Sequence, residues 1–410
     1  MSDMGVLGWL EERRNVATLA VISALRGAWF NLRGVIWQPF VLSLGISMGS
    51  LGGLESLTDL TRIIVQPIVG SASDIYGRKK FLLAREVLVL AAGLLFIFAG
   101  SWPLLFLGVV LVGLSSALFP IWNSLVAESS DPSELGYTHS IIGTVHMAVG
   151  LTATMAAGII ASAYGYRMVF IAASAIGLIT ILTVWKKLPE TMVRISDSKL
   201  NLRRLAGALI GSLRPPRYLW GFYIAMSVDL IAFNMGYRLL FGMLAEGYGY
   251  TPYMLGVVMT VSTAANALSQ IPLGKLVDRY GYARFMFISQ ILACVTIGLM
   301  LYSKSYTVVI AAQALMGVAA SFWGPAEQAW IAINVDPDKR ATAIASYSTF
   351  RGLASLPAPF IGGLLFDAYG FDIPMLANLV LAFVDGILIL VLVKDRVLPT
   401  EKDQTATESQ

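Results

Sequence analysis

Residues 70–80 read GSASDIYGRKK, and residues 274–284 read GKLVDRYGYAR. Both stretches hold a glycine, an aspartate and a second glycine in the same register, followed by basic residues. The two aspartates, Asp74 and Asp278, are 278 − 74 = 204 residues apart, which is half of the 410-residue chain. Each stretch also lies between two long apolar runs. A repeat at half the chain length predicts two similar halves that arose by duplication.

The composition indicates a protein that resides in a membrane. Hydrophobic residues make up 57% of the chain and charged residues 13%, and the mean hydropathy is +0.72, whereas soluble domains carry roughly 25% charged residues. A helix needs about 20 mostly apolar residues to cross the hydrocarbon core. The sequence therefore predicts an all-α membrane protein with twelve transmembrane helices in two six-helix halves. The predicted spans are 16–44, 50–72, 80–100, 103–127, 137–163, 167–186, 218–244, 253–276, 284–302, 306–332, 341–366 and 372–393.

The basic residues predict how the chain is oriented. Lys and Arg are concentrated in the loops on one side of a twelve-span arrangement, which the positive-inside rule assigns to the cytoplasm. Both termini then lie in the cytoplasm of a multi-pass cell-membrane protein. The expected organisation is an N-terminal half at 1–186, a central cytoplasmic linker at 187–217, a C-terminal half at 218–393 and a cytoplasmic tail at 394–410. Leucines beside Arg203 and Arg204 give the linker either a short amphipathic helix on the inner leaflet or a solvated tether.

The repeat extends beyond the signature, since Gly113 and Pro120 match Gly317 and Pro325. With its twelve spans, 6+6 repeat, long central loop and a signature after spans 2 and 8, the chain resembles the major facilitator superfamily over nearly its whole length. The resemblance implies a secondary transporter that works by alternating access. The pattern is most similar to the twelve-span drug:proton antiporter branch. It departs from that branch at Val109, where an Arg is usual.

The repeated signature is expected to act as a conformational latch. Gly70 is expected to allow a close helix approach, and Gly77 to allow a tight turn. Arg78 is placed to pair with Glu128 at the end of span 4. The resemblance assigns the whole cluster to holding the halves together in the outward-open state. Its members are Gly70, Asp74, Gly77, Arg78, Glu128, Gly274, Asp278, Gly281 and Arg284.

Charged residues within spans mark the candidate site, because each costs roughly 2.5–3.5 kcal/mol at a helix centre. Spans 1 and 2 run in opposite directions, so Arg33 and Glu55 are expected at one depth and Arg26 and Asp59 at another. Two intramembrane ion pairs follow, with Arg62 on the same face of span 2. The alternative is that these ion pairs have only a structural role and stabilise the contact between spans 1 and 2.

The second half supplies possible partners. Alignment of the repeats places Arg26 opposite Asp229 and His146 opposite Arg351, in spans that the resemblance assigns to the central cavity. Glu327 lies nearer the cytoplasm and is a candidate proton port. His146 has the alternative of a hydrogen-bonded packing residue. Three further charged residues are expected on outer, supporting helices and are left out of the site: Arg85, Glu86 and Asp385.

No sequence signature of ATP binding or of catalysis is present, so an ion or substrate gradient is expected to drive transport and no enzyme activity is expected. Neither a metal nor a cofactor is expected, and the net charge of +4 is explained by the inner loops without nucleic acid. The expected partners are a small-molecule substrate, protons bound at Asp59 or Asp229, and membrane lipids, with the protein a monomer. The favoured function is proton-coupled efflux of a hydrophobic or amphipathic compound. The alternatives are a small organic anion transporter and a non-transporting receptor with a carrier fold.

Overall fold

The computed structural model describes residues 13–100, 102–131, 134–190, 215–335 and 340–394. Throughout these ranges the regular structure is helical. The linker segment in which an amphipathic helix is expected, residues 200–209, lies outside the described residues.

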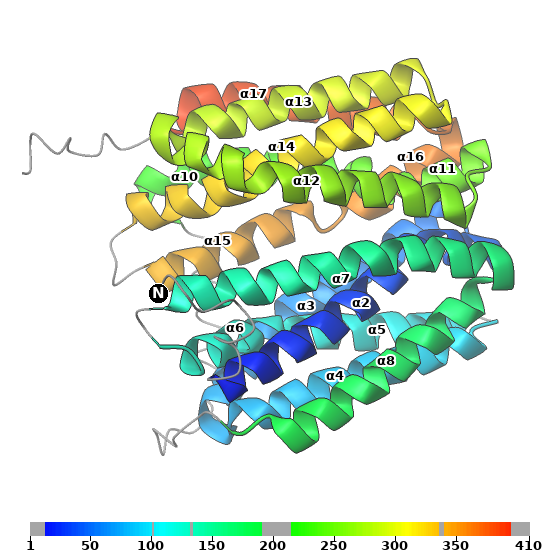
Figure 1. Cartoon of the computed structure of the whole chain (residues 1–410). Helices are drawn as coiled ribbons and strands as arrows, with labels where there is room; N and C mark the ends of the chain where they lie inside the picture. The colour runs from blue at the N-terminus through cyan, green and yellow to red at the C-terminus, as the bar shows by residue number, and fades with distance from the viewer. Residues whose placement is uncertain (1–12, 101, 132–133, 191–214, 336–339, 395–410) are drawn as a thin grey trace, which may run out of the picture.

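The first half contains six membrane-spanning segments. One of them is divided into α5 and α6 just before Pro120. The others are single helices that run between short turns (Figure 1). The elements are α2 (Arg14–Ser43), α3 (Met48–Tyr76), α4 (Arg78–Phe98), α5 (Trp102–Ala117), α6 (Phe119–Glu128), α7 (Leu135–Tyr164) and α8 (Tyr166–Lys187).

The second half repeats this arrangement with two divided spans. A 3₁₀ turn, η2, separates α10 from α11, and a turn before Ala358 separates α15 from α16. Together the halves give the predicted twelve spans. The elements are η1 (Arg217–Leu219), α10 (Trp220–Met235), η2 (Tyr237–Leu239), α11 (Leu240–Tyr248), α12 (Pro252–Tyr280), α13 (Tyr282–Tyr302), α14 (Tyr306–Asn334), α15 (Arg340–Ser355), α16 (Ala358–Tyr369) and α17 (Asp372–Leu392).

Three spans are less apolar or more interrupted than the rest. Among the described residues, nine helices are long and apolar enough to cross a membrane by length and composition alone. The other spans are α3, α12 and the divided pair α15 and α16. α3 carries Glu55, Asp59 and Arg62. Polar groups inside a span are costly, so α3 is one of the helices in which a functional site is to be sought.

Helices pair in the same way in both halves. In the first half α2 packs on α7, α3 on α5, and α4 on α8. In the second half α12 packs on α14 and α13 on α17, while α10 contacts α15, α16 and α17. The colours of the chain separate accordingly, with the blue to green helices of the first half in the lower part of the view and the light-green to red helices of the second half in the upper part (Figure 1).

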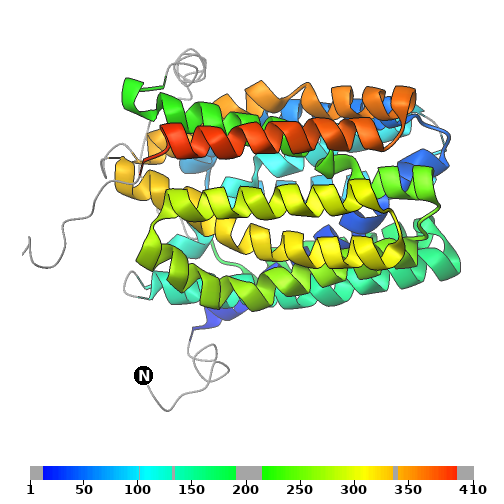
Figure 2. The same ribbon diagram turned by 90° about the horizontal axis from the view of Figure 1, so that it is seen from above.

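The two ends of the bundle differ in charge. We call one end the basic end, because the turns and helix ends there carry Arg78, Lys79, Lys187, Arg279 and Arg284. The start of α2 and the end of α17 both lie at this end (Figures 1 and 2). At the opposite end, the short turns 44–47, 249–251 and 370–371 connect the helices.

The halves are joined near the end opposite the basic end. α3 packs on α16, and α7 on α12. The Asp367 carboxylate accepts the N–H groups of Met48 at 3.0 Å and Gly49 at 2.8 Å. A Cβ added at Gly158 of α7 would lie 2.8 Å from the carbonyl oxygen of Pro252. Close backbone approach therefore closes the molecule at this end.

The glycines of the signature have different roles. Gly77 and Gly281 adopt φ of 97° and 100°, a region that favours glycine, so the predicted tight turn is confirmed at Gly77. The predicted close helix approach at Gly70 is wrong in this conformation. A Cβ added at Gly70 or Gly274 would meet nothing within 4 Å, because these helix ends lie away from the contact between the halves.

Candidate functional site

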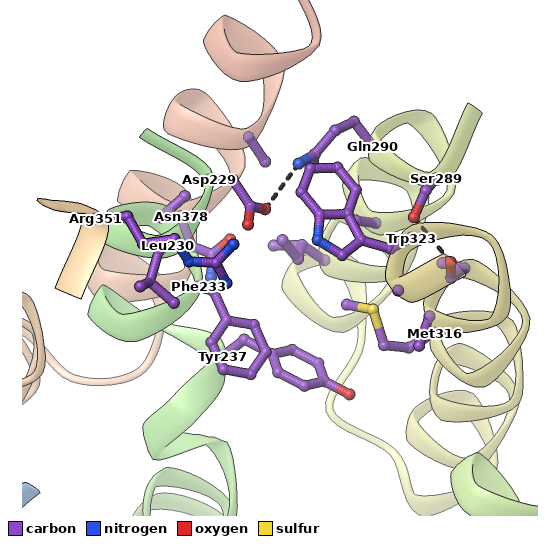
Figure 3. Close-up of a pocket in the computed structure, with 17 residues that line it drawn as sticks. Asp229, Leu230, Phe233, Tyr237, Ser289, Gln290, Met316, Trp323, Arg351 and Asn378 are labelled. Atoms are coloured by element: carbon purple, nitrogen blue, oxygen red, sulfur yellow. Dashed lines mark hydrogen bonds between the residues drawn. The ribbon is translucent and has the colours of Figure 1, made fainter. Parts of the chain in front are cut away.

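A cavity of about 330 Å³ lies in the second half. α10 and η2 contribute Asp229, Phe233 and Tyr237, while α14 contributes Trp323 and α15 contributes Arg351 (Figure 3). The wall is largely aromatic and aliphatic, with one carboxylate and one guanidinium among its polar groups. Apolar walls with a few placed polar groups are typical of small-molecule sites.

The Arg351 side chain is held beside the cavity by Glu327. A guanidinium nitrogen of Arg351 lies 2.6 Å from Glu327 Oε1, and the Tyr347 hydroxyl donates to the same oxygen at 2.9 Å. Trp323 Nε1–H donates to Glu327 Oε2 at 2.9 Å. The predicted proton port Glu327 is therefore the centre of a hydrogen-bonded cluster that positions Arg351 and Trp323.

Asp229 faces the cavity from α10 and is bound to the bundle behind it. Gln290 Nε2 donates to Asp229 Oδ1 at 2.8 Å (Figure 3) and to Asp385 Oδ2 at 2.7 Å. Asp385 is fully buried, so its expected place at a membrane edge is wrong, while its expected place on a supporting helix stays a prediction. The amide of Gln290 explains how an acid on α17 joins the site, since it reaches helices on both sides.

In the first half, Arg26 points into the helix bundle. Its Nε lies 3.7 Å from Glu86 Oε1, and its guanidinium lies 4.3 Å from the ring centre of Trp122. Arg85 also pairs with Glu86. The predicted pair of Arg26 with Asp59 is wrong, because Arg26 pairs with Glu86, a residue that was expected on a supporting helix. The prediction failed because it considered depth in the membrane and not the direction that the helix face presents.

Asp59 and Glu55 instead bind an arginine from the other half. Arg238 Nη1 lies 2.5 Å from Asp59 Oδ2, and Arg238 Nη2 lies 2.7 Å from Glu55 Oε2. Arg62 lies 3.3 Å from Asp59 on the same helix. We call Arg238, Glu55 and Asp59 the inter-half gate, because their ion pairs join η2 of the second half to α3 of the first.

Arg33 does not form the predicted ion pair with Glu55. Its guanidinium lies 4.7 Å from the ring centre of Trp37, and Trp37 Nε1–H donates to Glu55 Oε1 at 2.8 Å. An indole therefore stands between the two charges. Cation–π contact of this kind stabilises a cation by about 0.5–2 kcal/mol.

Gln38 of α2 reinforces the gate through the backbone. Its Nε2 donates to the carbonyl oxygen of Arg238 at 2.6 Å, and its Oε1 accepts the Gly242 N–H at 2.8 Å. The break between α10 and α11 leaves these backbone groups available to a side chain. Gln38 thus holds the broken part of span 7 against the first half.

His146 is a packing contact in this conformation. Its Nδ1–H donates to the Ser23 carbonyl oxygen at 3.1 Å. The nearby Gly27 allows this approach, because a Cβ there would lie 3.2 Å from His146 Nδ1. These contacts match the expected alternative of a hydrogen-bonded packing residue, and the cavity described above is lined by other residues.

At the basic end, the signature forms a cluster within the first half. Arg78 lies 2.5 Å from Asp74 Oδ1 and 3.0 Å from Glu128 Oε1, as predicted for Glu128. Glu190 accepts the N–H of Arg78 at 2.9 Å. In the repeat, Arg284 is exposed, and the side chain of Asp278 lies outside the described residues.

Several polar residues of these clusters were left out of the predicted site, among them Gln290, Glu86, Arg238 and Asp385. Gln290 and Glu86 could have been found by the repeat itself, because 290 − 86 = 204, the spacing of the two signatures. Arg238 lies within predicted span 7 and was overlooked near its end. For Asp385, the only indication in the sequence was that a charged residue inside a span is energetically unfavourable. The described residues contain no group of three or more His, Cys, Asp or Glu suited to a metal ion.

Comparison with known proteins identifies the family. The family model of the Major Facilitator Superfamily matches residues 18–244 and 228–409. The chain belongs to this superfamily and is a secondary transporter, not an enzyme. Multidrug resistance protein MdtG of Salmonella paratyphi A (strain ATCC 9150 / SARB42) is 26% identical over 371 residues, covering 88% of this chain and 90% of the relative. MdtG of Salmonella typhi gives the same identity and coverage.

Solved structures show the same fold at low sequence identity. The nucleoside transporter NupG matches with a TM-score of 0.71 and 14% identity, over 92% of this chain and 98% of that one. The human organic anion transporter MFSD10 (TETRAN) matches with a TM-score of 0.65 and 17% identity, over 92% and 99%. These likenesses support the twelve-span architecture.

Proposed function

We propose that this transporter exports a hydrophobic or amphipathic small molecule from the cytoplasm in exchange for protons. The observation that carries the proposal is the cavity in the second half, whose aromatic wall contains a carboxylate and a guanidinium. The distant likeness to MdtG, named a multidrug resistance protein, supports export. Aromatic and methionine walls adapt to varied apolar ligands.

The charges at the cavity favour an amphipathic ligand over a purely apolar one. The Arg351 charge is balanced by Glu327 at 2.6 Å, while the Asp229 carboxylate accepts a neutral amide at 2.8 Å. A ligand cation beside Asp229 would therefore supply a counter-charge that the Gln290 amide does not. The substrate class that this arrangement suits is a lipophilic cation.

Alternating access follows from where the halves touch. We place the basic end in the cytoplasm, by the positive-inside rule, so the structure corresponds to a carrier closed on the outside. Residues 1–186 and 218–393 would then rock as two units, with 187–217 as linker and 394–410 as tail. Opening to the outside requires separation of Arg238 from Glu55 and Asp59.

The gate offers a route for proton coupling. A carboxylate that takes up a proton loses its attraction for an arginine. Protonation of Asp59 from the outside would weaken its 2.5 Å contact with Arg238 and favour the outward-open state. Asp229 would exchange its proton for the substrate at the cavity. Glu327 remains the third candidate for the coupling proton.

The signature at the basic end would act in the opposite state. Asp74, Arg78 and Glu128 form a cluster within the first half. In the outward-open state the basic ends would approach each other, and this cluster with Gly274, Asp278, Gly281 and Arg284 would form the latch. The protein would act as a monomer in the cell membrane, among membrane lipids.

Flux through purified protein in liposomes tests the proposal. An imposed pH gradient should drive accumulation of tetraphenylphosphonium, a lipophilic cation, and collapse of the gradient should abolish it. Thermal stabilisation by the same compound would report binding separately, because a ligand of the folded state raises stability. Stabilisation and flux with an organic anion but not with the cation would contradict the proposal.

A second candidate function is transport of a small organic anion. The observation that favours it is Arg26, whose Nη1 is buried and has no hydrogen-bond partner among the described residues, in a cluster that contains two arginines and one glutamate. Such an excess of positive charge suits an anion. Benzoate uptake that is lost in Arg26→Gln and retained in Lys80→Gln would favour this reading. A protein with no flux of either compound would be the non-transporting receptor.

A further inference from the structure

Asp385 of α17 is a buried acid outside the proposed transport path. Its exposed fraction is 0%. Oδ2 accepts a hydrogen bond from Gln290 Nε2 at 2.7 Å, while Oδ1 has no partner among the described residues. An ionised carboxylate with one unmatched oxygen is very costly to bury, whereas a neutral carboxyl group costs far less.

Asp385 shares its hydrogen-bond donor with a second acid. The same Nε2 atom of Gln290 donates to Asp229 Oδ1 at 2.8 Å. A side-chain amide nitrogen carries two hydrogens, so it serves both acceptors at once. One amide nitrogen therefore holds carboxylates from α10 and α17 next to each other, and the amide itself brings no charge to balance them.

The other charged groups around the pair balance one another. α10 contributes Asp229 itself, and α13 contributes the neutral amide of Gln290 and the thiol of Cys294. Across the cavity, Arg351 of α15 is engaged with Glu327 of α14 at 2.6 Å. If both aspartates were ionised, this part of the bundle would hold two negative charges with a single amide between them. Like-charged neighbouring carboxylates resist being ionised together.

We propose that Asp229 and Asp385 form a carboxyl pair that binds protons, with Gln290 holding the two acids in register. When the cavity is empty each acid carries one proton. Asp229 faces the cavity and exchanges its proton, while Asp385 lies behind it and retains its own. When a lipophilic cation enters beside Asp229, one proton leaves and the charge of the site is unchanged. This inference rests on the proposed function for its role in coupling, but the proton binding itself does not.

Infrared spectroscopy of the purified full-length protein tests the pair without any substrate. A protonated carboxyl group gives a C=O stretching band that an ionised one lacks. The wild type should show this band at neutral pH and lose it on titration to alkaline pH. Asp385→Asn should lose the band or lose it at lower pH, because the remaining acid no longer faces a second negative charge.

A second variant and a control keep the test decisive. Asp229→Asn should also move the titration to lower pH, and it probes the pair even if Asp385→Asn does not fold. Asp372→Asn is the matched control, since Asp372 starts the same helix but pairs with Lys304 at 2.6 Å. A wild type without the band, or a titration unchanged in both variants, would overturn the proposal.

Transport then separates this inference from the proposed function. In liposomes with a pH gradient, Asp385→Asn should lose most of the gradient-driven accumulation of tetraphenylphosphonium while Asp372→Asn keeps it. Absence of proton-driven transport in the wild type would overturn the proposed function and leave the infrared result standing. Normal accumulation in Asp385→Asn, with transport present in the wild type, would overturn the coupling role of the pair.

Discussion

Glu86 and Gln290 occupy equivalent positions of the repeat, and each contacts the residue at the equivalent position of the first helix in its own half. Glu86 lies 3.7 Å from Arg26, and Gln290 lies 2.8 Å from Asp229. The duplication has thus preserved a contact while the signs of its charges diverged. The first half holds two buried arginines, Arg26 and Arg85, that share one carboxylate. The second half holds two buried acids that share the amide of Gln290.

The Arg26 contact predicts a specific pattern of stability. Glu86→Gln alone leaves two buried arginines without their counter-ion and should destabilise the protein by about 3–5 kcal/mol. Arg26→Met alone leaves Glu86 paired with Arg85 and should cost less. The double variant should be more stable than Glu86→Gln alone. Thermal unfolding in detergent measures this, with Arg62→Met as a half-exposed control. Strictly additive losses would show that the 3.7 Å contact carries no coupling.

Arg238→Gln should shift the carrier toward its outward-open state. The variant removes two ion pairs between the halves, and a loss of about 1.4 kcal/mol corresponds to a tenfold shift in population. A cysteine placed by Leu51→Cys, in a Cys294→Ser background, reports the change, because Leu51 is fully buried in the closed end. A membrane-impermeant maleimide should label it about tenfold faster. Equal labelling rates would rule out the gate.

Gly158→Leu should prevent closure of the end opposite the basic end. A Cβ at this position already comes 2.8 Å from the Pro252 carbonyl oxygen, so a larger side chain must separate α7 from α12. Transport should fall at least tenfold while membrane insertion is retained. Gly143→Leu on the same helix is the control, since nothing lies within 4 Å of a Cβ there. Similar transport in both variants would contradict the closure role.

Asp74→Asn and Arg78→Ala should impair transport and leave membrane insertion intact. Asp74 is largely exposed and its contact with Arg78 lies within one half, so the pair biases a conformational equilibrium rather than the fold. Lys80→Ala should transport normally, as expected of a residue that only follows the positive-inside rule. Wild-type flux in both Asp74→Asn and Arg78→Ala would remove the latch role.

Asp59→Asn and Asp229→Asn should separate coupling from binding. An amide keeps size and hydrogen bonding but does not titrate. A variant that removes the coupling proton should therefore retain tetraphenylphosphonium binding and exchange while losing accumulation driven by a pH gradient. If both variants still accumulate it, Glu327→Gln is the next variant to measure. Coupled transport in all three would contradict proton antiport and favour the organic anion alternative.

The repeat and the composition were enough to predict the fold, because a duplicated signature between apolar runs constrains both span number and symmetry. They also placed Arg351 and Asp229 in one cavity, since polar residues inside a span are rare, whereas Glu327 was expected nearer the cytoplasm. The depth of a charged residue in the membrane was not enough to predict its ion-pair partner. Asp59 and Arg238 are 179 residues apart, and their pairing depends on how the halves lean together, which no local pattern encodes.

The direction of side chains explains the remaining errors. Arg26 and Asp59 share a depth, yet Arg26 turns toward Trp122 and Glu86 inside its own bundle. The prediction that Asp385 lies at an outer position did not consider Gln290. The Gln290 side chain is long enough to contact both Asp229 of α10 and Asp385 of α17. Contacts that pass through a third residue cannot be inferred from the spacing of the two residues that they join.

The 3₁₀ turn η2 places the cavity and the gate one peptide bond apart. Tyr237 lines the cavity, and the next residue, Arg238, holds Glu55 and Asp59. A ligand that displaces Tyr237 must also disturb the ion pairs of Arg238. A loaded carrier and an empty one would therefore change between the inward-open and outward-open states at different rates. The turn can therefore serve as a kinetic checkpoint, one that limits futile cycling in which protons leak inward with no cargo moved.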